Sequence, residues 1–290
     1  MSHIVDNAII MAAGLSSRFA PISYERPKAL ITVKGEVLIE RQIRQLQEVG
    51  IKEIIIVVGY KKEQFYYLEE KFGVKIVENL EYEIRNNNSS IHAVKDYLKN
   101  SYICSADNYF LVNPFEREVD EAYYSAIYAE GETKEWCLEY DENEWITDVT
   151  IGGHDKWFML GHVFWSEEFS NKFCSILDEI YNEPSTADKL WEAIYMEHMD
   201  ELKLKIRKYI SDVIYEFDSL DELREFDEAY IGNTGSEIIQ FCAEEIGCKE
   251  SELEEFVPLK DLSGMAYGCT FKHGDTAYKY YYENGLLERM

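Results

Sequence analysis

The 290-residue sequence lacks several features that mark large classes of protein. It has no apolar run near the roughly 20 residues that a membrane-spanning helix needs, and no signal peptide opens it. Its six cysteines form no CxxC pair, which argues against a zinc site and against a disulfide framework. We therefore expect a cytoplasmic protein with reduced thiols and no membrane partner.

Positive charge is scarce in this chain. Lysine and arginine number 29 against 56 aspartates and glutamates, which gives a formal net charge of −27 at pH 7. Such a chain repels nucleic acids and anionic lipids, so we expect no nucleic-acid partner. If the protein handles phosphate groups, its cations must be concentrated locally.

Small residues and cations occur together near the N-terminus. The apolar run 8–10 leads into residues 11–19, MAAGLSSRF, and then into residues 26–28, RPK. Small residues let backbone N–H groups surround an anion, and Arg18 and Lys28 add positive charge. No Lys-Ser/Thr pair follows Gly14, so this is not a P-loop, and the three glycines of a dinucleotide site are missing. A phosphate-binding loop and an ordinary turn with two surface cations both stay open.

The first half of the chain alternates between strand-like and helix-like segments. Helical spacing of apolar residues predicts helices over 37–49, 65–71 and 91–98, and short apolar runs predict strands over 8–10, 54–58, 74–77 and 102–105. Such alternation is typical of a doubly wound α/β sheet, which binds ligands outside the carboxyl ends of its strands. The rule places residues 14–18 and 106–108 at the same edge.

Two aspartates follow predicted strands. Asp107 comes after strand 102–105, and Asp218 follows the alternating segment 213–217, just before a predicted helix over 220–230. A hard carboxylate beside phosphate groups suits Mg²⁺. The alternatives are a turn residue for Asp107 and a helix cap for Asp218, in competition with Ser219.

Residues 7 to about 230 resemble the bacterial CTP:phosphocholine cytidylyltransferases, a branch of the nucleotidyltransferases. The matching segments occur in order along this region: 12–28, 57–60, 86–87, 101–102, 106–109, 135–136 and 214–219. The resemblance implies a Rossmann-like core with a mixed, mainly parallel sheet in a domain of residues 1–230. It also implies that the protein transfers a cytidylyl group from CTP to phosphocholine, giving CDP-choline and pyrophosphate.

The resemblance implies a role for each residue that matches the family's motifs. Arg18 and Lys28 would be catalytic and contact the CTP phosphates, and Asp107 and Asp218 would bind Mg²⁺. Asn86, Asn87 and Ser90 would lie near the cytosine. The implied nucleotide-binding positions together are Ala12, Ala13, Gly14, Asn86, Asn87, Ser90 and Ala106.

Choline recognition calls for aromatic rings and carboxylates, because a quaternary ammonium has no N–H group to donate. Trp136 and Asp188 match the family positions that contact the trimethylammonium group. Where the family has a tyrosine two residues after the aspartate, this chain has Leu190, followed by Trp191. Other aromatic residues are available to complete the pocket: Tyr109, Tyr124, Trp157 and Tyr215.

Residues 231–290 form the second predicted domain, a small α+β tail. It contains a predicted helix over 236–247 and a predicted hairpin over 267–282 with its turn at 272–275. The tail resembles the start of the N-terminal lobe of a choline-kinase-like protein, without an HxD catalytic loop. We expect it to serve packing; the alternatives are a homodimer contact, a decayed fusion or a truncated kinase.

Two rival functions stay open. One is a nucleotidyltransferase that acts on another acceptor: phosphoethanolamine, 2-aminoethylphosphonate or a sugar 1-phosphate. The other is a non-catalytic regulatory homologue. The presence of Arg18, Lys28, Asp107 and Asp218 together argues against the second, since a decayed site is expected to lose at least one of them.

Overall fold

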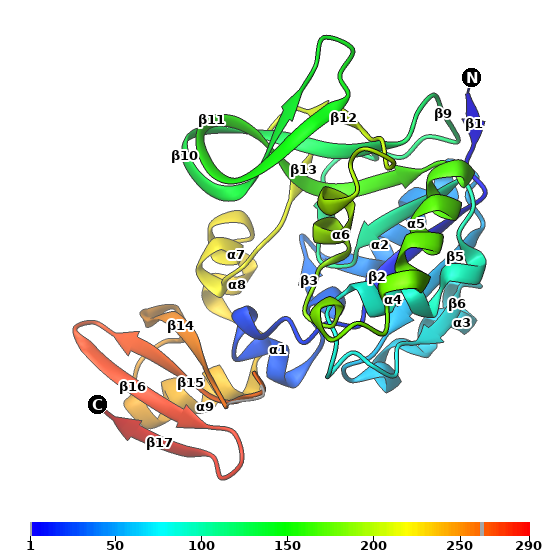
Figure 1. The fold of residues 1–290 in the computed structure, drawn as a ribbon. Coiled ribbons are helices and arrows are strands. Elements are labelled where there is room, and N and C mark those ends of the chain that lie inside the picture. The colour runs from blue at the N-terminus through cyan, green and yellow to red at the C-terminus, as the bar shows by residue number, and fades with distance from the viewer. Residues whose placement is uncertain (1, 262–263) are drawn as a thin grey trace. The chain divides into compact units, whose positions relative to one another are not determined.

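The computed structural model describes residues 2–261 and 264–290 (Figure 1). The chain divides into two compact units. The first consists of residues 1–14 and 39–215, and the second of residues 15–38 and 216–290. These bounds differ from those of the predicted domains 1–230 and 231–290, whose division at residue 230 remains a prediction. Each unit is described by itself.

A seven-stranded sheet forms the centre of the first unit, in the order β12-β10-β11-β7-β2-β5-β6. Strand β2 runs parallel to β5 and β7, β5 parallel to β6, and β10 parallel to β12, whereas β11 runs antiparallel to both β10 and β7. The expected mixed, mainly parallel sheet is confirmed. Its strands are β2 (Asn7–Ala12), β5 (Glu53–Val58), β6 (Lys75–Glu78), β7 (Ser101–Ser105), β10 (Tyr123–Tyr140), β11 (Ile146–Trp165) and β12 (Lys205–Tyr209).

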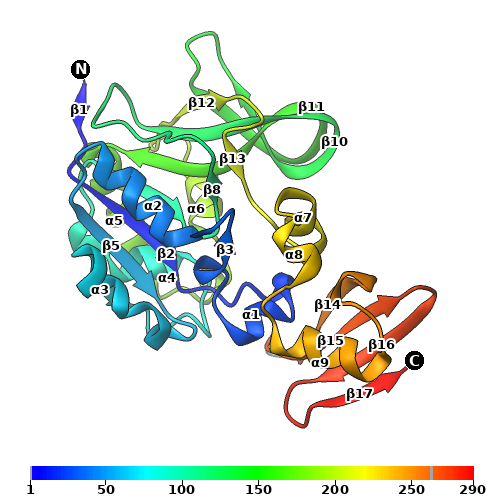
Figure 2. The same ribbon diagram turned by 180° about the vertical axis from the view of Figure 1, so that it is seen from behind.

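Helices cover both faces of this sheet (Figures 1 and 2). Helices α4, α5 and α6 lie on one face, and α2 and α3 lie on the other. The first face buries a large aromatic cluster that includes Trp165, Phe173 and Trp191. The helices are α2 (Leu38–Glu48), α3 (Tyr67–Phe72), α4 (Asn88–Ala93), α5 (Glu167–Ile180) and α6 (Trp191–Glu197).

The long β10–β11 hairpin departs from the expected alternation of strands and helices. Its strand β11 runs antiparallel to both of its neighbours in a mainly parallel sheet, and several register shifts interrupt the β10–β11 ladder. Two short antiparallel pairs complete the unit: β1 (His3–Ile4) with β9 (Glu118–Val119), and β8 (Tyr109–Phe110) with β13 (Ile214–Tyr215).

The second unit contains a four-stranded antiparallel sheet in the order β14-β15-β16-β17. Helix α9 (Glu237–Ile246) and the β15–β16 hairpin confirm the helix and hairpin predicted for the tail. The strands are β14 (Leu253–Lys260), β15 (Ala266–His273), β16 (Thr276–Tyr281) and β17 (Leu286–Arg289). None of the helices in the described parts of the chain is long and apolar enough to cross a membrane.

The helix predicted over 220–230 is interrupted. Helix α7 (Leu220–Phe226) ends before Asp227, and a short helix α8 (Ala229–Gly232) follows. The Asp227 carboxylate accepts a hydrogen bond from the Ala229 N–H at 3.2 Å. Side-chain capping of this kind competes with the continuation of a helix.

Gly59, directly after β5, allows a close approach of backbone and ring. A Cβ atom at this position would lie 2.6 Å from the Tyr82 Cγ atom and 2.9 Å from the Ala13 carbonyl oxygen. We expect Gly59→Ala to lower the free energy of unfolding by about 1–3 kcal/mol, because backbone cannot yield as a flexible side chain can. Gly14→Ala is the control, since a Cβ atom there meets no atom within 4 Å in the described part of the chain, its two chain neighbours apart. Urea denaturation measures both, and equal stability of the two variants would contradict the prediction.

Candidate active site

The loops after β2 and β7 lie side by side at the carboxyl edge of the sheet. The two strands pair in parallel, with Met11 opposite Ser105, and the Ala106 N–H donates to the Met11 carbonyl oxygen at 3.2 Å. The ends of β2 and β7 therefore lie at one edge, as predicted for Gly14 and residues 106–108; the same placement of residues 15–18 remains a prediction. Gly14 is exposed, and among the described residues beyond its two chain neighbours no atom lies within 4 Å of where its Cβ would be. The loop thus leaves open space where a ligand can approach its backbone.

Side chains fix the turn that contains Asp107. The Ser105 hydroxyl donates to Asp107 Oδ1 at 2.8 Å, and Gln42 Nε2 donates to the carbonyl oxygens of Ser105 and Asn108 at 2.9 and 2.8 Å. Asn108 is buried, whereas Asp107 is partly exposed. The turn thereby holds a carboxylate at the sheet edge, where the sequence predicts a metal ligand.

The predicted cytosine-contacting residues join two distant segments of the first unit. Asn86 N–H donates to the Ala187 carbonyl oxygen at 2.8 Å, and Asn86 Nδ2 donates to the Asp188 carbonyl oxygen at 3.1 Å. Asn87 Oδ1 accepts from the Trp191 N–H at 2.7 Å. The structure therefore brings the predicted nucleotide-binding and acceptor-binding segments together. Contact with the cytosine remains a prediction.

Ser90 is buried and its hydroxyl has a partner within the protein. Asn79 Nδ2 donates to Ser90 Oγ at 3.1 Å and to Ser89 Oγ at 2.8 Å. This contact fixes the start of α4 against the segment that follows β6. A contact from Ser90 to a nucleotide remains a prediction.

Glu192 belongs to the same cluster and was not predicted from the sequence. Asn87 Nδ2 donates to Glu192 Oε2 at 3.1 Å, and the Tyr124 hydroxyl donates to Oε1 at 3.4 Å. Burial raises the pKa of the Glu192 carboxyl to about 7, against the action of these hydrogen bonds. Nothing in the sequence distinguishes Glu192 from the many other glutamates of this acidic chain. The one local feature that relates it to the site is its spacing of four residues from Asp188.

Trp136 lies on β10, partly buried, and packs against the core cluster that contains Tyr124 and Trp191. The Trp191 ring is 1% exposed and stacks on Tyr124 with centroids 5.7 Å apart. Trp191 is therefore a core residue and does not replace the tyrosine that the family has near Leu190. The Asp188 side chain is exposed. Within residues 2–261 and 264–290 no polar or ring contact between Trp136 and Asp188 is seen, so their common pocket remains a prediction.

Arg18 and Asp218 meet in the second unit. Arg18 lies in the 3₁₀ turn η1 (Ser17–Phe19), and its Nη1 atom is 2.6 Å from Asp218 Oδ2. The two side chains are 71% and 39% exposed. An exposed ion pair contributes about 0–1 kcal/mol, so a phosphate group and a metal ion can replace each partner at little cost.

Lys28 is buried at the start of a second 3₁₀ turn, η2 (Lys28–Leu30). Its Nζ atom lies 3.8 Å from Glu216 Oε1 and 5.9 Å from the centre of the Phe19 ring. A carboxylate and a ring face both favour a buried ammonium group. Glu216 was not singled out from the sequence, because nothing local relates it to residue 28.

The carboxylates fit a metal ion that is bound together with its substrate. Within the described residues no three His, Cys, Asp or Glu side chains converge to form a metal site. Mg²⁺ is commonly held by one or two carboxylates, with substrate phosphates and water as its other ligands. Asp107 and Asp218 would supply hard oxygen donors to such a site. Because they belong to different units, their joint action remains a prediction.

Comparison with known proteins gives consistent matches. A family model for MobA-like NTP transferase domains matches residues 8–136. The chain is 38% identical over 221 residues to a choline-phosphate cytidylyltransferase of Streptococcus pneumoniae, which covers 76% of this chain and 96% of that protein. It is also 37% identical over 231 residues to a 2-aminoethylphosphonate cytidylyltransferase of Lancefieldella rimae. This match covers 78% of this chain and 93% of that protein.

Solved structures agree with these matches. The CTP:phosphocholine cytidylyltransferase from Streptococcus pneumoniae superimposes with a TM-score of 0.75 at 38% identity, over 78% of this chain and 99% of that one. The inositol-1-phosphate CTP transferase from T. maritima, at 17% identity and a TM-score of 0.62, shares the fold over 79% of this chain and 95% of its own.

The raised pKa of Glu192 predicts a specific pH dependence of stability. The folded state holds this proton more tightly than the unfolded state, so the free energy of unfolding should fall as pH rises from about 5 to above 7. Glu192→Gln should remove this component, which amounts to about 2 kcal/mol over that range. Denaturation at a series of pH values measures it.

Glu197→Gln is the matched control, because Glu197 is an exposed residue of the same helix, α6. It should keep the pH dependence of the wild type. If the Glu192→Gln curve runs parallel to the wild-type curve, Glu192 is not the group that titrates.

Proposed function

Because this chain belongs to the bacterial CTP:phosphocholine cytidylyltransferase family of nucleotidyltransferases, we propose that it transfers the cytidylyl group of CTP to phosphocholine, giving CDP-choline and pyrophosphate. The observation that carries the proposal is the 38% identity over three quarters of the chain, which spans nearly the whole of the relative. The resemblance noted in the sequence rests on the same region.

The reaction is an in-line displacement at phosphorus. A phosphate oxygen of phosphocholine attacks the α-phosphorus of CTP, a new P–O bond forms, and the bond to the bridging oxygen breaks as pyrophosphate leaves. The attacking phosphate is already ionised at neutral pH, so no covalent nucleophile or general base is needed. The protein has to position the reactants and neutralise charge.

Arg18 and Lys28 neutralise the phosphate charge in this proposal. Arg18 leaves its exposed pair with Asp218 and holds the departing pyrophosphate. Lys28, buried beside Glu216, acts on the charge that develops at the α-phosphate, where a preorganised cation is most effective. The backbone of Ala12, Ala13 and Gly14 supplies N–H groups for the remaining phosphate oxygens, and Ala106, whose N–H is bound to the Met11 carbonyl oxygen, lies beside the nucleotide.

A divalent metal ion completes the charge neutralisation. Nucleotidyltransferases of this family commonly use one, and we assign Mg²⁺ to Asp107 and Asp218. When bound, the ion neutralises charge on the phosphate groups. Ser105 orients the Asp107 carboxylate for this task, and Asp218 gains a free oxygen when Arg18 turns to the phosphate.

Base and acceptor recognition are assigned to the joined segments of the first unit. Asn86, Asn87 and Ser90 lie near the cytosine in this proposal, whereas Trp136 and Asp188 bind the trimethylammonium group. The hydrogen bonds from Asn86 to residues 187 and 188 support it, since they couple the two binding segments.

A related acceptor is the second candidate, because the 2-aminoethylphosphonate cytidylyltransferase is nearly as similar. A primary ammonium group needs hydrogen-bond acceptors, which Asp188 and Glu192 provide. A cytoplasmic location is supported by six cysteines that form no disulfide. A homodimer through residues 231–290 remains a prediction.

Removal of either proposed metal ligand should abolish turnover without unfolding the protein. We expect Asp107→Ala and Asp218→Ala to keep the wild-type melting temperature within a few degrees and to lose about 10²-fold or more in kcat. Asp120→Ala, which removes an exposed carboxylate elsewhere, should keep full activity. Wild-type turnover in either site variant would remove that residue from the metal site.

The choice of acceptor is tested by pyrophosphate release over a grid of nucleoside triphosphates and phosphorylated acceptors. CTP with phosphocholine should be the preferred pair, ahead of phosphoethanolamine and 2-aminoethylphosphonate. Trp136→Ala should lower kcat/KM for phosphocholine by about tenfold, since a ring face on a desolvated cation contributes about 1–2 kcal/mol.

Trp145→Ala is the control for general loss of a tryptophan. Trp145 lies in the turn of the β10–β11 hairpin, and its ring contacts Lys205 of β12. Equal use of phosphocholine and 2-aminoethylphosphonate by the wild type would favour the second candidate. Absence of any turnover across the grid would overturn the proposed function.

A further inference from the structure

We propose that residues 231–290 position the proposed CTP-binding residues, because contacts from this tail hold the segments that carry Arg18, Lys28 and Asp218. The inference rests on the proposed function of these residues. It assigns the tail a role in the reaction, whereas the sequence indicates only a packing element. All the contacts that carry it lie within the second unit, residues 15–38 and 216–290.

The stretch between Arg18 and Lys28 is anchored to the tail. Tyr24, in α1 (Ile22–Glu25), stacks on Tyr282 with ring centroids 3.9 Å apart and planes at 18°. Glu25 Oε1 accepts from the Ile238 N–H at 3.0 Å, in the first turn of α9. Arg26 Nη2 donates to the Gly235 carbonyl oxygen at 2.9 Å. Strand β14 also lies against η1, the turn that contains Arg18.

The Asp218 segment is anchored to the same tail. Asp218 N–H donates to Glu222 Oε2 at 2.7 Å, and the Ser219 hydroxyl caps α7 by accepting from the Glu222 N–H at 3.2 Å. Residue 218 is thereby fixed to α7. Its position then depends on how α7 itself is held.

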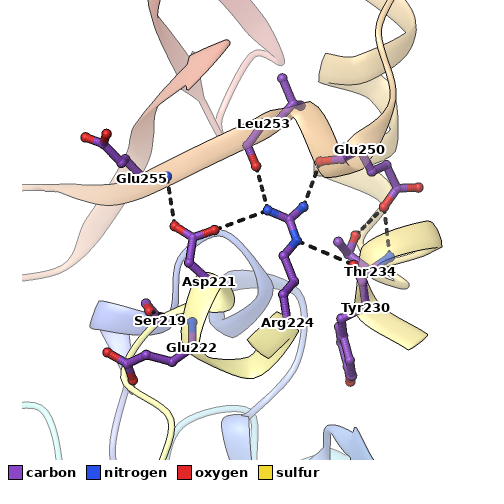
Figure 3. Close-up of polar contacts among 9 residues, drawn as sticks. All are labelled: Ser219, Asp221, Glu222, Arg224, Tyr230, Thr234, Glu250, Leu253 and Glu255. Atoms are coloured by element: carbon purple, nitrogen blue, oxygen red, sulfur yellow. Dashed lines mark hydrogen bonds and ion pairs between the residues drawn. The ribbon is translucent and has the colours of Figure 1, made fainter. Parts of the chain in front are cut away.

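Arg224 ties α7 to the tail (Figure 3). Its Nη1 atom donates to the Leu253 carbonyl oxygen at 2.7 Å, and its Nη2 atom donates to the Glu250 carbonyl oxygen at 2.7 Å. Asp221 Oδ1 accepts from Nη1 at 3.2 Å. The guanidinium is buried, so these acceptors replace water, and the planar fork fixes the direction of α7 relative to β14.

A bulge in β14 is shaped to meet α7. The ladder with β15 is irregular between Glu254 and Val257, and Glu255 has a left-handed φ of 54°. A non-glycine residue adopts this conformation at a cost, and the bulge takes its N–H out of the ladder. That N–H donates to Asp221 Oδ2 at 3.0 Å (Figure 3). The strand thus gives up regular pairing where it binds α7, the helix that follows Asp218.

The anchored segments are too short to hold their own shape. Turns η1 and η2 have three residues each, α1 has four and α7 has seven. Helical segments of this length are not stable by themselves in water, so outside contacts determine their positions. For η1, α1 and α7 such contacts come from the tail, and η2 begins two residues after Arg26, which is bound to Gly235. A displacement of the tail should therefore move the cations before it affects the acceptor-binding segments of the first unit.

The test uses the full chain and two adjacent tyrosines. Tyr282→Ala removes the ring that stacks on Tyr24, whereas Tyr281→Ala removes a ring that stacks on Tyr267 within the tail sheet. We expect Tyr282→Ala to raise the KM for CTP by about threefold to tenfold and to leave the KM for phosphocholine within about twofold of the wild type. Tyr281→Ala and Tyr282→Phe, which keep the stack on Tyr24, should match the wild type.

Hydrogen–deuterium exchange supplies a readout that does not depend on activity. Amides of residues 15–38 should exchange faster in Tyr282→Ala than in Tyr281→Ala. If the Tyr282→Ala variant shows no cooperative unfolding transition, the Tyr282→Leu variant is used in its place, because leucine keeps much of the side-chain volume without the ring face. An active wild type in which both alanine variants behave alike would overturn the inference. A wild type without cytidylyl transfer would overturn the proposed function. The exchange experiment would then show by itself whether the tail holds residues 15–38.

Discussion

Parallel pairing of β2 with β7 is the constraint on which the first unit's candidate site depends. Because both strands run the same way, their carboxyl ends must lie at one edge of the sheet, and Ala106 even bonds back to Met11. The strands read as apolar runs because both faces of the sheet are covered by helices. The loops beyond them have no ladder to continue, so side chains such as Gln42 fix them instead.

Amide side chains supply many of the hydrogen bonds that hold these loops. An asparagine offers both donors and an acceptor, so a single residue can join two backbones. Asn87 accepts from the Trp191 N–H and donates to Glu192, and Asn88 donates to the Thr186 carbonyl oxygen. The asparagines that the family resemblance relates to the cytosine therefore also hold the acceptor segment. Substitution of Asn87 is therefore expected to weaken the binding of both proposed substrates, CTP and phosphocholine.

Each of the two cations of the candidate site is paired with a carboxylate. A chain with a net charge of −27 surrounds its few useful cations with carboxylates, as seen for Arg18 with Asp218 and for Lys28 with Glu216. The exposed pair of Arg18 is easily exchanged for a phosphate, whereas the buried Lys28 is preorganised and stays in place. In the proposed reaction this difference in burial gives the two cations different tasks, and in our inference the tail holds the segments on which both lie.

The sequence alone determined the core strands and the loops that end β2 and β7, because apolar periodicity and small-residue loops are local signals; the roles of Arg18 and Lys28 remain predictions. The tail helix and hairpin could be predicted for the same reason. The β10–β11 hairpin, the place of Glu192 beside Asn87, the Lys28–Glu216 pair and the Arg224 anchor were decided by the tertiary structure. Each joins residues far apart in the chain, or depends on burial, which no local pattern records. The grouping of residues 15–38 with 216–290 is of this kind. It arises because short turns acquire a fixed shape only against a partner that the chain supplies some two hundred residues later.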